Sequence, residues 1–244
     1  MLTSLFRKLN EKQNAYWFKT GRDTFRSYIR CIDQALPVSG AILDVGAGSV
    51  TLATYLPRLG RDGLLIAADY SNEGLAQNQS KAKVVTDAEA FPFPNETFDV
   101  ISASCVLEHI ENPVPVVAEC FRVLKKGGTL VFYTPHRRSY IAALARLTPL
   151  AFHRRIRTLQ TGKSMGEVEV IKTFYRLNTF QDLEKYRGNF RLGSMEICVG
   201  APSYTTFLPP PFHFLFILFH KVLQTVPSLR AAFGETIIGC LVKP

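Results

Sequence analysis

The chain has 244 residues, which is enough for one large α/β domain or two small ones, and its 47% hydrophobic content excludes wholesale disorder. Its 29 Lys and Arg residues exceed its 20 Asp and Glu residues, and the net charge of +9 favours anionic partners or, equally, an inert basic surface. The five scattered cysteines form no C-x-x-C pair, which argues against a disulfide framework or a zinc site and for a reducing, cytoplasmic location.

The apolar stretches of the chain are too short to predict a membrane span. The first residues, MLTSLFRKLNEK, contain no apolar core and no small-residue cleavage site, so we expect no secretory signal there. The longest apolar stretch, residues 212–223, is shorter than the roughly 20 residues that cross a bilayer as a helix, and His and Lys interrupt it.

Strands and helices alternate across the first half of the chain. Residues 21–36 predict an amphipathic helix, which Pro37 and Gly40 end. Buried strands are expected at 41–45, 64–70, 83–85, 98–104 and 129–134. Between them we expect helices near 50–59, after a Ser71 cap and near 113–124, and a helix stop and turn at 125–128. This alternation predicts a parallel sheet whose ligand lies at the carboxyl ends of the strands.

The last 110 residues are less regular. We expect a basic, helix-compatible stretch at 137–157, a helix near 180–187 capped by Thr179, and final strands at 194–199 and 236–242. Without a repeat or a low-complexity linker, we predict one domain. Its parts are an N-terminal helical segment (1–40), a ligand-binding core (41–134), a basic lid or substrate segment (135–193), and the final strands with an aromatic insertion at 204–226 (194–244).

The motif ILDVGAGSV, residues 42–50, places an acid and two glycines at the end of the first strand. Gly46 and Gly48 allow a tight turn that a ligand can approach closely. Asp69 ends the second strand, 23 residues beyond Gly46, where a carboxylate can accept hydrogen bonds from both hydroxyls of a ribose. Together, the glycine turn and Asp69 predict that the protein binds a nucleoside-like ligand. NAD fits less well, because Val50 and Thr51 break the G-x-G-x-x-G fingerprint.

Five segments, in order and spacing, resemble class I S-adenosylmethionine-dependent methyltransferases, in the group that includes quinone-biosynthesis methylases. They are LDVGAGSV, AADYS, TDAEAFPFPNETFDVI, SASCVLEHI and LKKGGTLVFYTP. The resemblance covers residues 41–134 and implies an α/β fold with a Rossmann-like, doubly wound sheet of about seven strands. Most strands would be parallel and the last antiparallel, with helices on both faces.

The resemblance also implies S-adenosylmethionine as the cofactor and a role for each candidate residue. Gly46, Gly48 and Ser49 would line the methionine end, and Asp44, at the end of the same strand, is a further cofactor-binding candidate. Asp69 would hold the ribose, Asp87 with the backbone of Ala88 would contact the adenine amino group, and Ser104 would close over the methionine portion. Val50 stands where the family commonly has a third glycine. No metal is expected.

Two histidines are candidate catalytic bases, because a hydroxyl acceptor must lose a proton during methyl transfer. His109 follows the fourth strand in LEHI, and His136 follows the fifth strand in TPH. The alternative for each is a histidine that only holds a loop. His213 and His220, seven residues apart in the aromatic insertion, are expected to be packing or interfacial residues.

Two segments bear on partners. The basic stretch predicts either an anion site or a solvated helix face, through Arg137, Arg138, Arg146, Arg154, Arg155 and Arg157. No nucleic-acid-binding motif accompanies it. The insertion at 204–226 predicts a helix buried on one side, at the core, a substrate pocket, a partner or a membrane surface. An aromatic wall there would suit an apolar or lipid-linked acceptor, through Phe212, Phe214, Phe216 and Phe219.

The sequence therefore predicts a methyltransferase that acts on a small-molecule or lipid- or sugar-linked acceptor, with oxygen as the favoured atom. It predicts a cytoplasmic protein, with contact to a membrane as an open alternative. Two further readings stay open: a cofactor-binding scaffold that has lost catalysis, and an NAD-dependent oxidoreductase.

Overall fold

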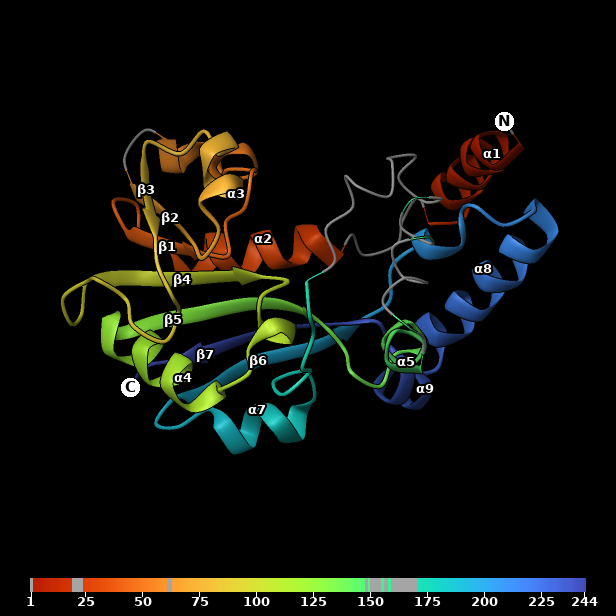
Figure 1. Ribbon diagram of the computed structural model, residues 1–244. Coiled ribbons are helices and arrows are strands. Elements are labelled where there is room, and N and C mark those ends of the chain that lie inside the picture. The colour runs from red at the N-terminus through yellow and green to blue at the C-terminus, as the bar shows by residue number, and fades with distance from the viewer. Residues whose placement is uncertain are drawn as a thin grey trace. The chain divides into compact units, whose positions relative to one another are not determined.

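The computed structural model describes residues 2–18, 24–60, 63–147 and 171–244, and also 149, 155 and 158 (Figure 1). The chain divides into two compact units, each built from three segments. The helical unit comprises Met1–Thr24, His136–Lys172 and Ile197–Thr236. The sheet unit comprises Phe25–Pro135, Thr173–Glu196 and Ile237–Pro244.

A seven-stranded sheet has the strand order β3-β2-β1-β4-β5-β7-β6. The strands are β1 (Ala41–Val45), β2 (Leu64–Asp69), β3 (Ala82–Val85), β4 (Phe98–Ser104), β5 (Leu124–Pro135), β6 (Arg191–Cys198) and β7 (Thr236–Val242). Strands β1 to β5 pair in parallel, whereas β7 is antiparallel to β5 and to β6. The predicted Rossmann-like, doubly wound sheet is confirmed. Its strand order reverses between β1 and β4, where such sheets bind their ligands.

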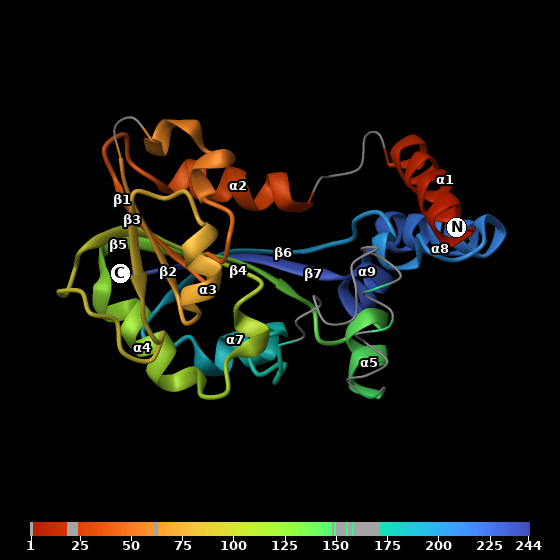
Figure 2. The ribbon, with the colours of Figure 1, turned by 45° about the horizontal axis from the view of Figure 1, so that its top comes forward.

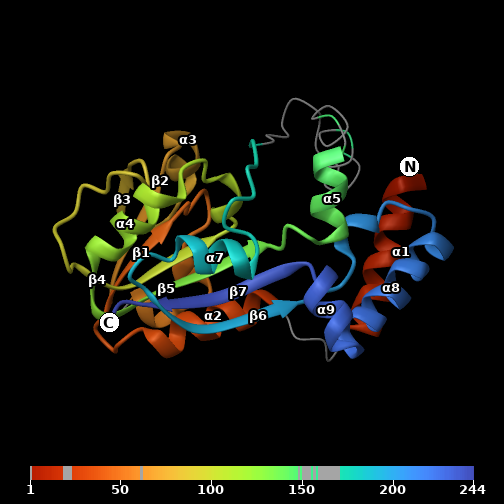
Figure 3. The same cartoon turned by 90° about the horizontal axis from the view of Figure 1, so that it is seen from below.

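Helices cover both faces of this sheet (Figure 3). They are α2 (Thr24–Ala35), α3 (Asn72–Gln77), α4 (Pro113–Val123) and α7 (Phe180–Tyr186). From α2, the Tyr28 hydroxyl reaches Ser102 of β4, while the neighbouring Ile101 packs with Val117 of α4. Successive strand residues point to opposite faces, so α2 and α4 lie on opposite sides. Ser71 and Thr179 cap α3 and α7 as predicted, since their hydroxyls accept hydrogen bonds from backbone N–H groups.

Two local predictions are wrong. Residues 50–59 form no α-helix but two 3-10 turns, Leu52–Thr54 and Pro57–Gly60. Pro57 lacks an N–H group and so cannot continue the first turn. Helix α4 does stop at Val123, ahead of residues 125–128, as predicted. These residues are not a turn that precedes a separate strand, however, because β5 already begins at Leu124 and shifts register against β4 within this stretch. Gly127, at φ 75°, allows the shift and donates its N–H to the Lys243 carbonyl.

The helical unit contains α1 (Leu2–Trp17), α5 (Tyr140–Leu147), α8 (Pro210–Thr225) and α9 (Pro227–Phe233). Helix α1 lies against α8 (Figure 2), and the ring centroids of Trp17 and Phe214 are 5.7 Å apart. The predicted aromatic insertion is therefore mainly helix α8. Within the described residues, no single helix has the length and apolar character to cross a membrane. Helices α8 and α9 have that length and apolar character only when they are taken together, and the pair is bent by 113°.

Candidate active site

The two glycines after β1 have different structural reasons to be glycine. Both have left-handed backbones, with φ 67° at Gly46 and 52° at Gly48. A Cβ atom on Gly46 would collide with a methyl group of Val106, whereas one on Gly48 would meet nothing within 4 Å. Gly46 thus lets the turn pack against the chain after β4, and Gly48 borders open space that a ligand can enter.

Asp69, at the carboxyl end of β2, holds this turn. Its Oδ2 accepts the Gly48 N–H at 2.8 Å and its Oδ1 accepts the Ser71 N–H at 2.8 Å. A carboxylate offers about four lone-pair positions, so both oxygens keep capacity for a ligand after these two bonds form. The side chain is half-buried and fixed in orientation. Such a group can bind the two hydroxyls of a ribose as predicted.

Asp44 lies beneath the turn in a buried hydrogen-bonded chain. The Ser102 hydroxyl donates to Asp44 Oδ1 at 2.7 Å, so the Tyr28 hydroxyl, 2.7 Å from Ser102 Oγ, must donate to Ser102. Burial, with a smaller contribution from the nearby charge of Asp69, raises the pKa of Asp44 to about 7, even though the Ser102 hydrogen bond lowers it. The predicted contact of Asp44 with the cofactor stays a prediction, because its carboxyl group is hydrogen-bonded to Ser102 inside the protein. Ser49, in contrast, is exposed.

The predicted adenine contacts lie at the same edge of the sheet. Thr86, the residue after β3, donates its N–H to the Asp69 carbonyl at 2.9 Å, which ties the turn containing Asp87 and Ala88 to the end of β2. Asp87 is exposed, and its Oδ1 accepts the Glu89 N–H at 2.9 Å. The fold therefore brings the candidate ribose and adenine residues together.

The turn after β4 carries the candidate base His109. Ser104 ends β4 opposite Tyr133, and the exposed Cys105 that follows has φ 55°. A non-glycine residue in this left-handed region is uncommon, and such residues cluster at functional sites.

Glu108 fixes the next turn from inside. Its Oε2 accepts the Thr134 hydroxyl at 3.0 Å, and its carbonyl accepts the Phe174 N–H at 2.7 Å. Burial raises the pKa of Glu108. The half-buried His109 therefore stands on a rigid turn at the end of β4.

His136 has a different environment, in the helical unit. Its N–H donates to the Glu235 carbonyl at 2.7 Å, and its Nδ1 lies 3.0 Å from the Gly234 carbonyl oxygen. The side chain is buried, and this burial lowers its pKa. These contacts favour the alternative reading, a histidine that anchors the chain after β5.

Sequence reasoning missed two supporting residues. Asn78, buried just past α3, donates its amide to the carbonyl oxygens of Gly48 at 2.9 Å and Ala47 at 3.4 Å. Tyr28, which the sequence places only on an apolar helix face, starts the hydrogen-bonded chain to Asp44. Nothing in the local pattern distinguishes this Asn or this Tyr from others. A buried polar group that supports the turn becomes visible only through its partners.

The basic stretch is described only in part. Arg137, Arg138 and Arg155 are exposed, which agrees with a solvated face and equally with an anion site. Arg154 and Arg157, like the side chain of Arg146, lie outside the described residues.

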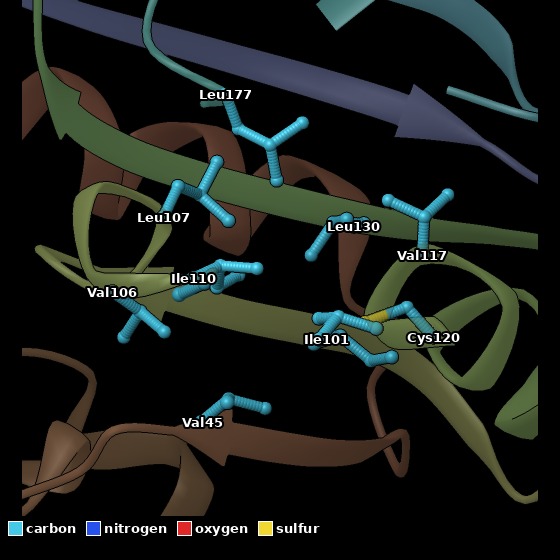
Figure 4. A pocket seen from close by; sticks show the side chains of 11 residues that line it. Val45, Ile101, Val106, Leu107, Ile110, Val117, Cys120, Leu130 and Leu177 are labelled. Atoms are coloured by element: carbon cyan, nitrogen blue, oxygen red, sulfur yellow. The ribbon is translucent and has the colours of Figure 1, made fainter. Parts of the chain in front are cut away.

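A small cavity lies between the sheet and α4 (Figure 4). Its volume is about 20 Å³, close to that of one water-sized sphere, and its walls are entirely apolar, with Val45, Ile101, Val117 and Leu130 among them. It is a packing gap in the core and cannot hold a nucleoside.

Comparison with known proteins identifies the segment that contains this site. Residues 43–132 match the sequence family described as a methyltransferase domain. The chain contains a class I methyltransferase domain. The matched residues of this domain run from β1 to β5 and include every cofactor-binding candidate named above.

Curated relatives share this domain but extend beyond it. The chain is 39% identical over 105 residues to a malonyl-[acyl-carrier protein] O-methyltransferase of Herminiimonas arsenicoxydans, covering 41% of this chain and 40% of the relative. It is 33% identical over 131 residues to a ubiquinone biosynthesis O-methyltransferase of Methylococcus capsulatus, covering 46% and 53%. The chain therefore spans about half the length of the curated relatives it matches.

Solved structures share the fold over most of the chain. A SAM-dependent methyltransferase of Methanosarcina mazei has a TM-score of 0.55 at 17% identity, covering 87% of this chain and 96% of that one. A possible histamine N-methyltransferase of Thermotoga maritima has a TM-score of 0.53 at 15% identity and covers both chains completely. At these identities the likeness establishes the fold alone.

S-adenosylmethionine is the cofactor of this domain class, and the residues present fit it. Gly48 leaves open space where a side chain would stand, and beside it the Asp69 carboxylate offers acceptors for a ribose. The ribose would bind at Asp69, the methionine end near Gly46 to Ser49, and the adenine near Asp87. The G-x-G-x-x-G spacing that NAD requires is absent, because Val50 and Thr51 follow Gly48 and Ser49.

Proposed function

We propose that the protein transfers a methyl group from S-adenosylmethionine to an oxygen atom of a small-molecule or lipid- or sugar-linked acceptor. The observation that carries this proposal is the Asp69 carboxylate, held by two 2.8 Å bonds beside the open space at Gly48. When bound, the cofactor supplies an electrophilic methyl group on a sulfonium. The protein's part is then to bind and orient, and correct alignment alone can contribute several kcal/mol.

Oxygen as the acceptor atom is supported by the position of His109. A hydroxyl acceptor must lose its proton during methyl transfer, and an imidazole is a side chain that can take it. The rigid turn fixed by Glu108 would hold His109 at the end of β4, beside Ser104. The relatives are named both as O-methyltransferases and as C-methyltransferases, so their names leave the atom open.

We also propose that the protein works in the cytoplasm. All five cysteines are free, and two of them are buried without a disulfide, as expected in a reducing compartment.

The test is transfer of label from methyl-labelled S-adenosylmethionine in a cell extract, followed by partition into organic solvent, water and precipitated macromolecules. When the wild-type protein is added, we expect label in a small molecule or a lipid, and with Asp69→Ala we expect much less of it at a low cofactor concentration. Label in nucleic acid or protein would contradict the proposed acceptor class. Tight binding of S-adenosylhomocysteine without any transfer would favour the catalytically inactive scaffold.

A further inference from the structure

The two units differ sharply in charge. The three sequence segments of the helical unit contain 15 Lys and Arg but only 5 Asp and Glu, whereas those of the sheet unit contain 14 and 15. The net charge is thus +10 in the helical unit and −1 in the unit that binds the cofactor. Exposed members of the basic set are Lys8, Lys12, Arg137, Arg138 and Arg155. A positive charge of this size, confined to one unit, fits an anionic surface as its partner.

Helix α1 has its polarity reversed relative to an ordinary surface helix. Its two buried residues are Asn10 and Asn14, while Leu2, Leu5 and Leu9 are exposed at spacings of three and four. Asn10 donates its amide to the carbonyl oxygens of Thr206 and Leu208, each at 2.8 Å. The two asparagines therefore lie in the inner seam of this helix, and the three leucines face outward together with Lys8, Glu11 and Lys12.

Helix α8 also exposes large apolar side chains. Its buried residues are His213 and His220 together with Ile217 and Leu223, whereas Phe212 and Leu215 are each 60% exposed. Exposed Phe219 and Val222 continue the stripe, so that outward apolar side chains recur three, seven and ten residues after Phe212.

The inward histidines of α8 are hydrogen-bonded. His213 Nε2 lies 3.0 Å from Asn14 Oδ1 of α1, and its Nδ1 lies 2.9 Å from Thr205 Oγ1. His220 Nε2 lies 2.9 Å from the Tyr140 hydroxyl, and its Nδ1 lies 2.9 Å from the Gly200 carbonyl oxygen. Both inward histidines of α8 are thus hydrogen-bonded at both ring nitrogens, although Asn10 Oδ1 of α1 is buried without a partner.

Helices that face water bury apolar side chains and expose polar ones. A pair that turns hydrogen-bonded Asn and His side chains inward and presents leucine and phenylalanine outward matches helices that border an apolar medium. The bent α8–α9 pair is apolar enough to enter a membrane, but its 113° bend fits a position in the interface better than a straight span.

We propose that the helical unit docks on the surface of an anionic phospholipid bilayer through the outward faces of α1 and α8. The outward apolar side chains, Leu2, Leu5 and Leu9 of α1 with Phe212, Leu215, Phe219 and Val222 of α8, enter the acyl-chain boundary. The basic residues of the unit lie among the headgroups. Docking does not depend on methyl transfer. If the proposed function holds, docking favours the lipid-linked acceptor among its alternatives.

The test is flotation of the full chain with vesicles of phosphatidylcholine alone and of phosphatidylcholine with phosphatidylglycerol. We expect the wild type to float with the anionic vesicles, less so in high salt, and hardly at all with the neutral ones. The double variant Phe219→Asp, Val222→Asp should reduce the floated fraction about tenfold or more, because two charges would enter the apolar boundary.

The matched control is Val38→Asp, Val114→Asp, which adds the same two charges at sites of the sheet unit that are 79% and 66% exposed. It should float like the wild type. Failure of the wild type to float, or equal loss in both double variants, overturns the proposal. So does a stable dimer in sedimentation that the 219/222 variant splits, since a second copy would then cover the face. Unchanged affinity of each variant for S-adenosylhomocysteine separates a failure of docking from a failure of the proposed function.

Discussion

Replacing Asp69 with alanine should weaken cofactor binding without unfolding the protein. In the structure the carboxylate accepts the Gly48 and Ser71 N–H groups, each at 2.8 Å, and it keeps lone pairs for the ribose hydroxyls. Hydrogen bonds to a charged group contribute about 1.5–3 kcal/mol each when buried, and less at a half-buried side chain that shares water. We therefore expect a loss of about 2 kcal/mol, or roughly 30-fold in Kd.

The assay is isothermal titration calorimetry with S-adenosylhomocysteine. Asp99→Ala is the matched control, because Asp99 also accepts a backbone N–H, that of Ala41 at 2.8 Å, but does so at the amino end of the sheet. It should bind like the wild type. Unchanged affinity in a folded Asp69→Ala variant, or an equal loss in Asp99→Ala, would refute the assignment of Asp69.

Four further substitutions probe the site. Gly46→Ala should lower the free energy of unfolding by about 3 kcal/mol or more, because the added Cβ atom both strains the left-handed backbone and collides with Val106. Gly48→Ala should lower the free energy of unfolding by only about 1 kcal/mol, since its Cβ atom meets nothing. Equal unfolding midpoints of the two variants in urea would contradict this. The raised pKa of Asp44 makes the folded state bind an extra proton between about pH 4 and 7, so the stability of the wild type falls as pH rises. Asp44→Asn lacks this titration, so its free energy of unfolding should gain up to about 4 kcal/mol relative to that of the wild type from pH 4 to 8. A difference in the free energy of unfolding that stays constant with pH would count against this. His109→Gln should lower kcat about 100-fold or more and leave affinity for S-adenosylhomocysteine unchanged, measured with an acceptor from the labelling screen. An unaltered kcat would remove His109 as the base.

The centre of the sheet could be predicted from the sequence because strands such as β1 and β4 are buried on both faces. Strands of this kind read as short, nearly continuous apolar runs, and β4 matches its predicted limits, 98–104, without change. The glycine turn and Asp69 could be predicted for a similar reason. Only a few residue types suit a ligand at the end of a parallel strand, and they stand at recognisable spacing.

The features that could not be predicted have both local and long-range causes. The helix expected near 50–59 is replaced by 3-10 turns around Pro57, where local hydrogen bonds override a weak periodic pattern. The burial of His136 depends on carbonyl groups almost a hundred residues away, at 234 and 235. The orientation of α8 also depends on distant partners. The sequence shows that this segment is apolar, but only the hydrogen-bond partners of His213 and His220 reveal which face of the helix is inside.

The most direct test of the central claim is calorimetric titration of the purified wild-type chain with S-adenosylhomocysteine and, in parallel, with NADH. We predict binding of S-adenosylhomocysteine in the micromolar range and no heat from NADH beyond dilution. Binding of NADH alone, or of neither ligand by a folded protein, would contradict the assignment of the β1 turn and Asp69 to S-adenosylmethionine.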